Sequence, residues 1–146
     1  MKELWDRLGQ VRTSQLRVED GGTTREGSGT VSIHRADPSV IEWEERGSWR
    51  DQAGHETSYH DRLRWRLDAV AAVLSLYHLR QGEAHPVHLA DLQNEGAGRF
   101  HSPLPHLCAD DTYLAELKLT SGRIELHWDV RGPKKNYRVY RTYTLT

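Results

Sequence analysis

The segment Tyr59-His-Asp-Arg-Leu-Arg-Trp-Arg-Leu67 decides the fold of this chain, because its second half alternates strictly between apolar and charged side chains. Leu63, Trp65 and Leu67 fall on one side of an extended strand, and the intervening arginines fall on the other. A helix would spread both kinds of side chain around its circumference and leave no coherent apolar face. The segment therefore predicts a half-buried β-strand.

The same period of two recurs along nearly all of the chain after residue 10. It is clear at residues 41–44, 113–119 and 123–131, and it continues from Tyr137 to the C-terminus. A run of about eight to ten short strands with mostly short connections closes most naturally into a barrel, which removes free sheet edges. We therefore expect residues 1–146 to form a single all-β domain, an antiparallel up-and-down barrel. Turn-forming residues separate the strands at Asp20-Gly-Gly22, Gly54, Gln81-Gly82, Gly96-Ala-Gly98, Ser121-Gly122 and Gly132-Pro133.

Two segments are not simple strands. Lys2–Leu8 has its apolar residues on one side and is followed by Gly9, which predicts a short helix that plugs one end of the barrel. Leu63–Leu79 is ambiguous, because good helix formers at helical spacing follow Asp68. We favour strand, turn and strand there, with a helix as the alternative.

Charge and hydropathy exclude several classes of partner. Twenty basic and 21 acidic residues give a net charge of −1 without a block of either sign, so we expect no nucleic-acid binding. The longest apolar stretch, Ala69–Tyr77, is about half of the ~20 residues that a membrane helix needs, and the charged start at Met1–Glu3 does not resemble a signal peptide. We expect a cytoplasmic protein with no membrane partner. The single cysteine, Cys108, agrees with a reducing compartment.

Several motifs carry a resemblance to a known family. They are His106-Leu-Cys-Ala-Asp-Asp-Thr-Tyr113, Trp128-Asp-Val-Arg-Gly-Pro-Lys-Lys-Asn-Tyr137 and Tyr140-Arg-Thr-Tyr143, with weaker likeness at Glu42–Gly47 and Arg64–Leu67. They resemble the lipocalin-like (calycin) domain-of-unknown-function family numbered 6314, over most of residues 9–146. The resemblance implies a calycin-like barrel and brings no established activity. The chain departs from the family at Leu76–Gly82 and on to His88, where the family usually has a phenylalanine-rich hairpin.

The alternation of His106, Cys108 and Asp110 would present nitrogen, sulfur and oxygen on one side of an extended chain. Such a set suggests zinc or copper, with His85, His88 or His101 as further ligands, but the spacing matches no established metal motif. We favour a structural alternative, in which Cys108 is a small buried residue and Asp110 or Asp111 binds backbone amides in a turn shaped by Pro103 and Pro105. Cys108 as a nucleophile, with His101 or His106 as its base, has no accompanying sequence signature.

Arg141 lies in phase with the apolar positions of the last strand, so its side chain is expected to point inward. A buried arginine needs a partner, and we favour an internal carboxylate such as Glu45 over an acidic ligand. Lys134 and Lys135, in the turn before that strand, could contact an anion at a barrel mouth, although solvated turn residues are the simpler interpretation. The candidates for a ligand pocket are Tyr113, Trp128, Tyr137, Arg141, Lys134 and Lys135.

Three functions remain open. The leading hypothesis is a small-molecule-binding barrel whose ligand is aromatic or acidic. The second is a lyase, isomerase or decarboxylase that uses His101 or His106 with Asp110 and Tyr113 as acid and base groups. The third is a structural or partner-binding barrel with a filled interior, as a homodimer through an exposed strand. The sequence names no cofactor, and a barrel with a polar lumen could invert which face of each strand lies inward.

Overall fold

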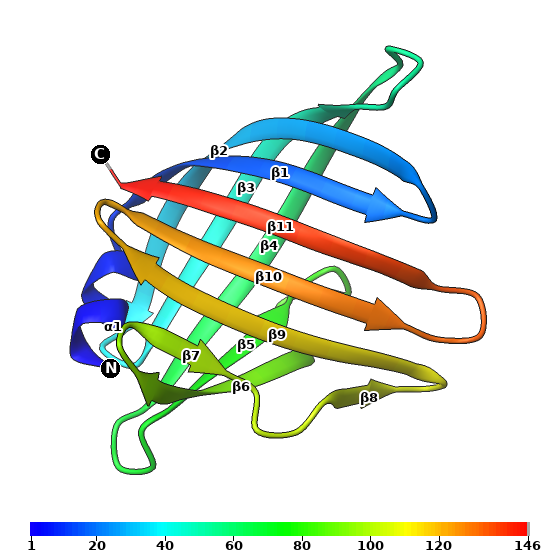
Figure 1. The fold of residues 1–146 in the computed structure, drawn as a ribbon. Helices are drawn as coiled ribbons and strands as arrows, with labels where there is room; N and C mark the ends of the chain where they lie inside the picture. The colour runs from blue at the N-terminus through cyan, green and yellow to red at the C-terminus, as the bar shows by residue number, and fades with distance from the viewer. Residues whose placement is uncertain (146) are drawn as a thin grey trace.

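The computed structural model describes residues 1–145, in which strands follow one another along almost the whole chain after a short N-terminal helix (Figure 1). The all-β, antiparallel up-and-down barrel that the sequence predicts is confirmed. The elements are α1 (Lys2–Leu8), β1 (Val11–Asp20), β2 (Thr23–Asp37), β3 (Val40–Arg50), β4 (Glu56–Asp68), β5 (Val73–His78), β6 (Val87–Gly96), β7 (Arg99–His101), β8 (His106–Cys108), β9 (Asp111–Thr120), β10 (Arg123–Arg131) and β11 (Asn136–Leu145).

The sheet closes because the last strands pair with the first. Consecutive strands pair from β1 to β7, β7 pairs with β9, and β9, β10 and β11 lead back to β1. Within the described residues this ring contains ten strands. β8 is not one of these ten strands. It pairs with β9 along the same edge of β9 that pairs with β7. Pro103 and Pro105 separate β7 from β8, since a proline has no N–H to donate to a neighbouring strand.

Helix α1 closes one end of the barrel, as the sequence predicts (Figure 1). Leu4 and Leu8 are fully buried in the core, and Trp43 Nε1 donates a hydrogen bond of 2.9 Å to the Leu8 carbonyl oxygen. The Trp43 ring makes edge contacts with Trp65 and Tyr143, with centroids 5.4 Å and 4.7 Å apart. These three rings form an apolar floor that ties the helix to the strands. No helix within residues 1–145 has the length and apolar character to cross a membrane.

The ambiguous segment is strand, turn and strand, which confirms the favoured interpretation. β4 ends at Asp68 and β5 begins at Val73, with Leu67 paired opposite Leu74. The Asp68 carboxylate accepts hydrogen bonds from the amides of Val70 and Ala71, at 3.1 Å and 3.0 Å. The Asp68 side chain thereby satisfies two backbone amides and stabilises a turn in competition with a helix. The segment after Asp68 therefore forms a turn although its residues are good helix formers.

Two glycines allow the sheet to carry a large inward side chain. Gly29 and Gly47 are opposite each other on β2 and β3, and Gly47 is opposite Tyr59 on β4. A Cβ atom at Gly29 would lie 2.6 Å from the Tyr59 hydroxyl, and one at Gly47 would lie 2.8 Å from its ring. Only glycine leaves room for this approach, so Tyr59 lies across both strands and reaches Ser14 on β1.

Replacing Trp43 tests the floor. We expect Trp43→Phe to lower the free energy of unfolding by about 1–3 kcal/mol, because it removes ring volume from the core and the donor to the Leu8 carbonyl. Urea unfolding followed by circular dichroism measures the change. Trp49→Phe is the matched control, since Trp49 is only half-buried beneath the Arg25 guanidinium. Equal losses in the two variants would contradict the role given to Trp43.

Candidate functional site

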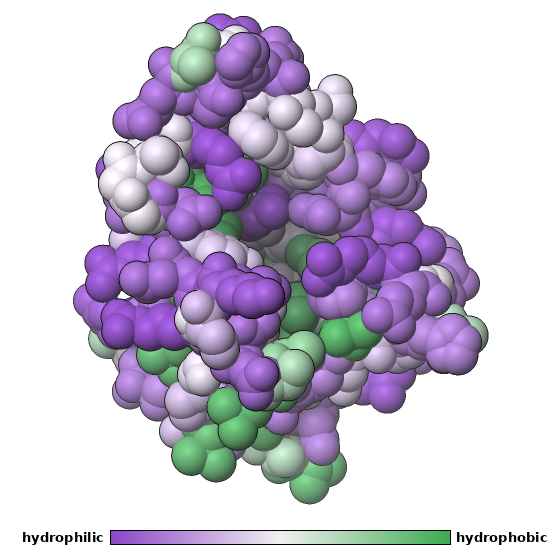
Figure 2. Space-filling view, turned by 90° about the vertical axis from the view of Figure 1, so that its right-hand side faces the viewer, coloured by the Kyte–Doolittle hydropathy of each residue, from purple (hydrophilic) through white to green (hydrophobic). Residues whose placement is uncertain are grey.

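The barrel encloses a cavity of about 220 Å³ at the end opposite the helix. Figure 2 looks onto this end and shows a hollow with apolar side chains inside a mostly hydrophilic rim. The wall is largely aliphatic and aromatic, from β4, β5, β6, β9, β10 and β11. Its apolar members are Leu63, Leu76, Leu89, Tyr113, Leu126, Trp128, Val130, Tyr137, Val139 and Tyr143, and its polar members are Asp61, Arg62, His78, Arg80 and Arg141.

Four of the six ligand-binding candidates named from the sequence line this cavity: Tyr113, Trp128, Tyr137 and Arg141. They come together because they occupy inward positions of β9, β10 and β11, where Val130 is opposite both Tyr113 and Tyr137. Burial, and then the neighbouring Tyr113, raise the pKa of Tyr137, so its hydroxyl stays protonated at neutral pH. The alternation of the strands is sufficient to predict this grouping.

Arg141 forms an internal ion pair with Glu45, as the sequence predicts. Its Nη1 donates to Glu45 Oε2 at 2.6 Å, and its Nη2 donates to Asp61 Oδ2 at 3.1 Å. The Glu45 side chain is 0% exposed and that of Arg141 is 17% exposed, so neither charge could be buried at this depth without the other. The pair lies beside the cavity, and the guanidinium forms part of its wall.

Two hydroxyl groups join Arg141 at Glu45 Oε2, while Glu45 Oε1 is buried without a hydrogen-bond partner in the described residues. Its Oε2 accepts hydrogen bonds from Tyr59 at 2.6 Å and from Ser14 at 2.9 Å, in addition to the bond from Arg141. Burial, and then the hydrogen bond to Glu45, raise the pKa of Tyr59 to about 12, so the phenol remains a donor at neutral pH. One carboxylate oxygen therefore holds three donors from three other strands, which makes the inner wall rigid.

Tyr143 is part of the cavity wall and carries an unpaired polar group. Its side chain is fully buried, yet within the described residues its hydroxyl has no hydrogen-bond partner. Burial, and then the charge of Glu45, raise its pKa well above the ordinary value. A neutral phenol in this position can donate or accept one hydrogen bond, and an unpaired buried hydroxyl is unfavourable until a partner arrives.

At the mouth, Arg80 and His78 form a pair that the sequence analysis did not single out. Arg80 Nη2 lies 3.0 Å from His78 Nε2, and no carboxylate in residues 1–145 forms an ion pair with Arg80. Burial, and then the Arg80 charge, lower the pKa of His78. The neutral imidazole can accept from the guanidinium but leaves its charge uncompensated. Arg80 lies in a loop beyond a strand end, so no alternation pattern identified it.

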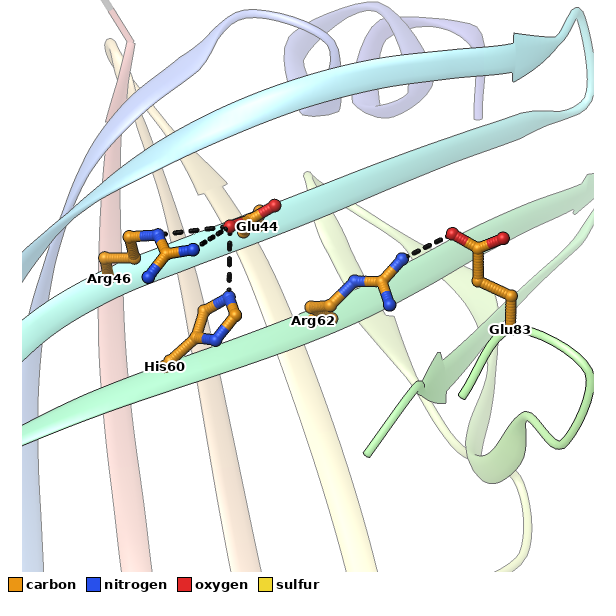
Figure 3. A network of polar contacts seen from close by, with 5 residues as sticks. All are labelled: Glu44, Arg46, His60, Arg62 and Glu83. Atoms are coloured by element: carbon orange, nitrogen blue, oxygen red, sulfur yellow. Dashed lines mark hydrogen bonds and ion pairs between the residues drawn. The ribbon is translucent and has the colours of Figure 1, made fainter. Parts of the chain in front are cut away.

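The other arginine of the rim, Arg62, is already paired. Figure 3 shows it on the outer side of the sheet, donating from Nη2 to Glu83 Oε1 at 2.6 Å. Beside it, Glu44 Oε1 accepts from Arg46 Nη2 at 2.6 Å and lies 3.1 Å from His60 Nε2. These exposed charges follow the outward positions of β3 and β4 and satisfy one another. Arg80 is thus the rim arginine without an acidic partner in the described residues.

The two lysines of the last turn behave differently from each other. Lys135 Nζ lies 3.2 Å from Asp111 Oδ2 and donates to the Tyr113 hydroxyl at 3.4 Å, and these contacts raise its pKa. It contacts Tyr113 at the rim while remaining an exposed residue of the turn. Lys134 is exposed and forms no hydrogen bond or ion pair within the described residues. Neither lysine lines the cavity.

The hypotheses built on β8 need correction. Cys108 is exposed, so the interpretation of it as a small buried residue is wrong. Ala109 has a φ of 55°, which turns the chain and removes Asp110 from the alternation of His106 and Cys108. Asp111 pairs with Lys135 and does not bind backbone amides. In residues 1–145 no three His, Cys, Asp or Glu side chains come together as metal ligands.

The proposed acid and base groups do not meet in the cavity either. His101 lies on β7 with Nδ1 3.0 Å from Glu95 Oε1, whereas the His106 ring contacts His88 at a centroid distance of 4.9 Å. Of the four residues in the enzymatic hypothesis, only Tyr113 lines the cavity. His106 and Asp110 lie outside the ring, on β8 and just after it, past the proline break. His101 lies on β7 next to the buried Phe100, in the opposite phase of the strand.

A second hollow, of about 760 Å³, lies against β1, β2 and β3. Most of its lining is polar, and two of its members, Arg50 and Glu56, form an ion pair at 3.2 Å. Its apolar contributions are few, chiefly Leu16 and Trp49. The smaller cavity inside the barrel has the mixed apolar and polar lining that is typical of ligand sites, so it is the candidate site.

Fold and site together define a closed antiparallel β-barrel with an internal, partly apolar cavity. The chain belongs to the Family of unknown function (DUF6314), whose model matches residues 9–145. A search among curated proteins finds no match.

Three solved structures share the barrel architecture at low similarity. A de novo designed fluorescence-activating β-barrel is 12% identical with a TM-score of 0.45, and 94% of each chain is covered. A redesigned β-barrel, mFAP1, bound to DFHBI, is 9% identical with a TM-score of 0.43, covering 94% of this chain and 95% of that one. EF1p2_mFAP2b bound to DFHBI is 8% identical with a TM-score of 0.46, covering 96% of each chain. These TM-scores are too low for a comparison of sites.

A double-mutant cycle tests the buried ion pair. Arg141→Met should lower the free energy of unfolding by about 3–5 kcal/mol, because it leaves the buried Glu45 charge without its guanidinium. Adding Glu45→Gln should recover about 1–2 kcal/mol or more of that loss. Arg46→Met, which breaks an exposed pair with Glu44, is the control and should cost at most about 1 kcal/mol. An equally small cost for Arg141→Met, or no recovery in the double variant, would contradict the assignment.

Mild acid should destabilise the barrel. The pKa values of His78 and His106 are lowered by burial, in His78 next by Arg80 and in His106 next by His88, from an ordinary value of 6.5. The unfolded chain therefore binds more protons, and the free energy of unfolding falls as the pH drops from neutral through 6.5 and below. Urea unfolding at pH 7.5 and pH 5.5 measures the change. His78→Gln/His106→Gln should reduce it, whereas His34→Gln, on the surface, should not; an unchanged pH dependence in the double variant would refute the prediction.

Proposed function

We propose that this protein binds a small aromatic molecule inside the barrel, with the ring against Trp128 and Tyr137. The observation that carries the proposal is the cavity of about 220 Å³, which opens at one end and combines an apolar wall with a few polar groups. A barrel that only had to be stable would fill this space with side chains, since voids cost stability. We also propose that the barrel is of the lipocalin-like (calycin) kind and that the protein is cytoplasmic.

The volume limits the size of the ligand. Drug-sized ligands occupy pockets of about 300–1,000 Å³, whereas an engineered cavity of about 150 Å³ accepts benzene. A cavity of about 220 Å³ therefore suits one aromatic ring with short substituents. Offset or edge contacts with Trp128, Tyr113 and Tyr137 would favour such a ring over an aliphatic body of the same volume.

The two other functions have less support. The enzymatic hypothesis depended on His101, His106 and Asp110, and none of these lines the cavity. The hypothesis of a filled structural barrel required that no pocket exist. Ligand binding is the function that uses both the cavity and its polar groups.

The test uses the neutral probe 4-methylphenol and the tryptophan indole signals in an NMR titration. We expect the Trp128 signal to move and saturate, while that of Trp49, which lines no part of the cavity, stays unchanged. Val139→Trp should weaken binding more than about tenfold by filling the cavity. Arg138→Trp, one position earlier and exposed, should not, and both variants are checked for folding by circular dichroism. Free indole at millimolar concentration serves as a second neutral aromatic probe. If neither 4-methylphenol nor indole moves the Trp128 signal of the unaltered protein, the proposal is overturned.

A further inference from the structure

The two ends of the cavity carry opposite charge. Around Arg141, the buried Glu45 and the partly exposed Asp61 (42% exposed) share a single guanidinium, so one negative charge is in excess. At the mouth, Arg80 has only the neutral His78 as a partner, so one positive charge is in excess. The charges of Arg80 and Asp61 act on His78 in opposite directions, which places the imidazole within reach of both. A ligand that matches this cavity must itself be polarised.

We propose that the ligand is an aromatic carboxylate with a hydroxyl or amino group at the far end of the ring, and that it enters with that group first. This inference rests on the proposed function and names the class and orientation of its ligand. The carboxylate would lie at the mouth against Arg80, and the hydroxyl or amino group would meet the Tyr143 hydroxyl at the inner end.

The inner end selects a hydrogen-bonding group and not an anion. Arg141, the obvious anchor for an acid, already donates to Glu45 and Asp61. An incoming carboxylate would face those two carboxylates across the cavity wall, and like charges at short range are unfavourable. By contrast, the Tyr143 hydroxyl is fully buried and unpaired within the described residues, so a ligand hydroxyl or amine would supply its missing partner.

The mouth selects an anion. Two other cations of the rim are already paired: Arg62 with Glu83 and Lys135 with Asp111. Arg80 lines the cavity and has no carboxylate partner within residues 1–145, whereas the unpaired Lys134 does not line the cavity. The planar guanidinium of Arg80 can bind a carboxylate through two N–H groups. His78 holds that guanidinium at the cavity wall, with Nη2 and Nε2 3.0 Å apart.

The test compares three probes by isothermal titration calorimetry: 4-hydroxybenzoate, benzoate and 4-hydroxybenzamide. We expect 4-hydroxybenzoate to bind the unaltered protein most tightly. Arg80→Gln should weaken 4-hydroxybenzoate about fivefold and leave the neutral 4-hydroxybenzamide unchanged, a modest effect because the arginine is exposed. Lys134→Gln, which removes an exposed cation of the last turn, is the matched control and should change neither probe.

Tyr143→Phe tests the inner end. It should weaken 4-hydroxybenzoate about five- to tenfold, so that it binds no better than benzoate. Because the hydroxyl is unpaired in the structure, this variant should be as stable as the original protein, which separates a loss of binding from a loss of folding.

Three results would overturn the inference. Equal weakening of 4-hydroxybenzoate by Arg80→Gln and Lys134→Gln would show a general charge effect and no anion subsite at Arg80. Equal affinity of 4-hydroxybenzoate for the original protein and Tyr143→Phe would refute the inner contact. If 4-methylphenol binds in the cavity but the carboxylates do not, this inference fails while the proposed function holds; if neither binds, both fail.

Discussion

The buried ion pair between Arg141 and Glu45 is the interaction on which the interior of this barrel depends. Two charges inside a small barrel are tolerated only if they are paired and hydrogen-bonded, and each strand near the pair contributes to that requirement. Tyr59 and Ser14 donate to Glu45, and Asp61 takes the second guanidinium nitrogen. Two members of this network, Asp61 and Arg141, also form part of the cavity wall, so the network borders the cavity.

The alternation of side chains was enough to predict most of this arrangement. A strand exposes one face to the interior, so the phase of Leu63 and Trp65 on β4 and of Tyr137 and Arg141 on β11 specifies what lies inside. The same reasoning gave Arg141 an internal carboxylate. The closed ring follows from the number of strands and their short connections, although the pairing of β1 with β11 is a long-range contact that no local pattern specifies.

Local patterns failed where the chain leaves regular strands. The proline break after β7 places β8 outside the ring, and the positive φ of Ala109 ends the alternation that had grouped Asp110 with His106 and Cys108. Arg80 was missed for the same reason, because it follows β5 in a loop and owes its place to His78. The position of a polar side chain on a loop at the barrel mouth depends on tertiary contacts, which no local pattern specifies. Here the contact with His78 holds Arg80, whose charge is opposite to the excess charge around Arg141 and Glu45.

The central claim is that the cavity is polarised and binds an aromatic acid in one orientation. A crystal structure of the protein soaked with 4-hydroxybenzoate tests it most directly. The account predicts the ring beside Trp128, the phenolic oxygen within hydrogen-bond distance of Tyr143 Oη, and the carboxylate at Arg80. A carboxylate buried against Arg141 with the phenol at the mouth, or a ligand seated only in the hollow against β1, β2 and β3, would contradict it.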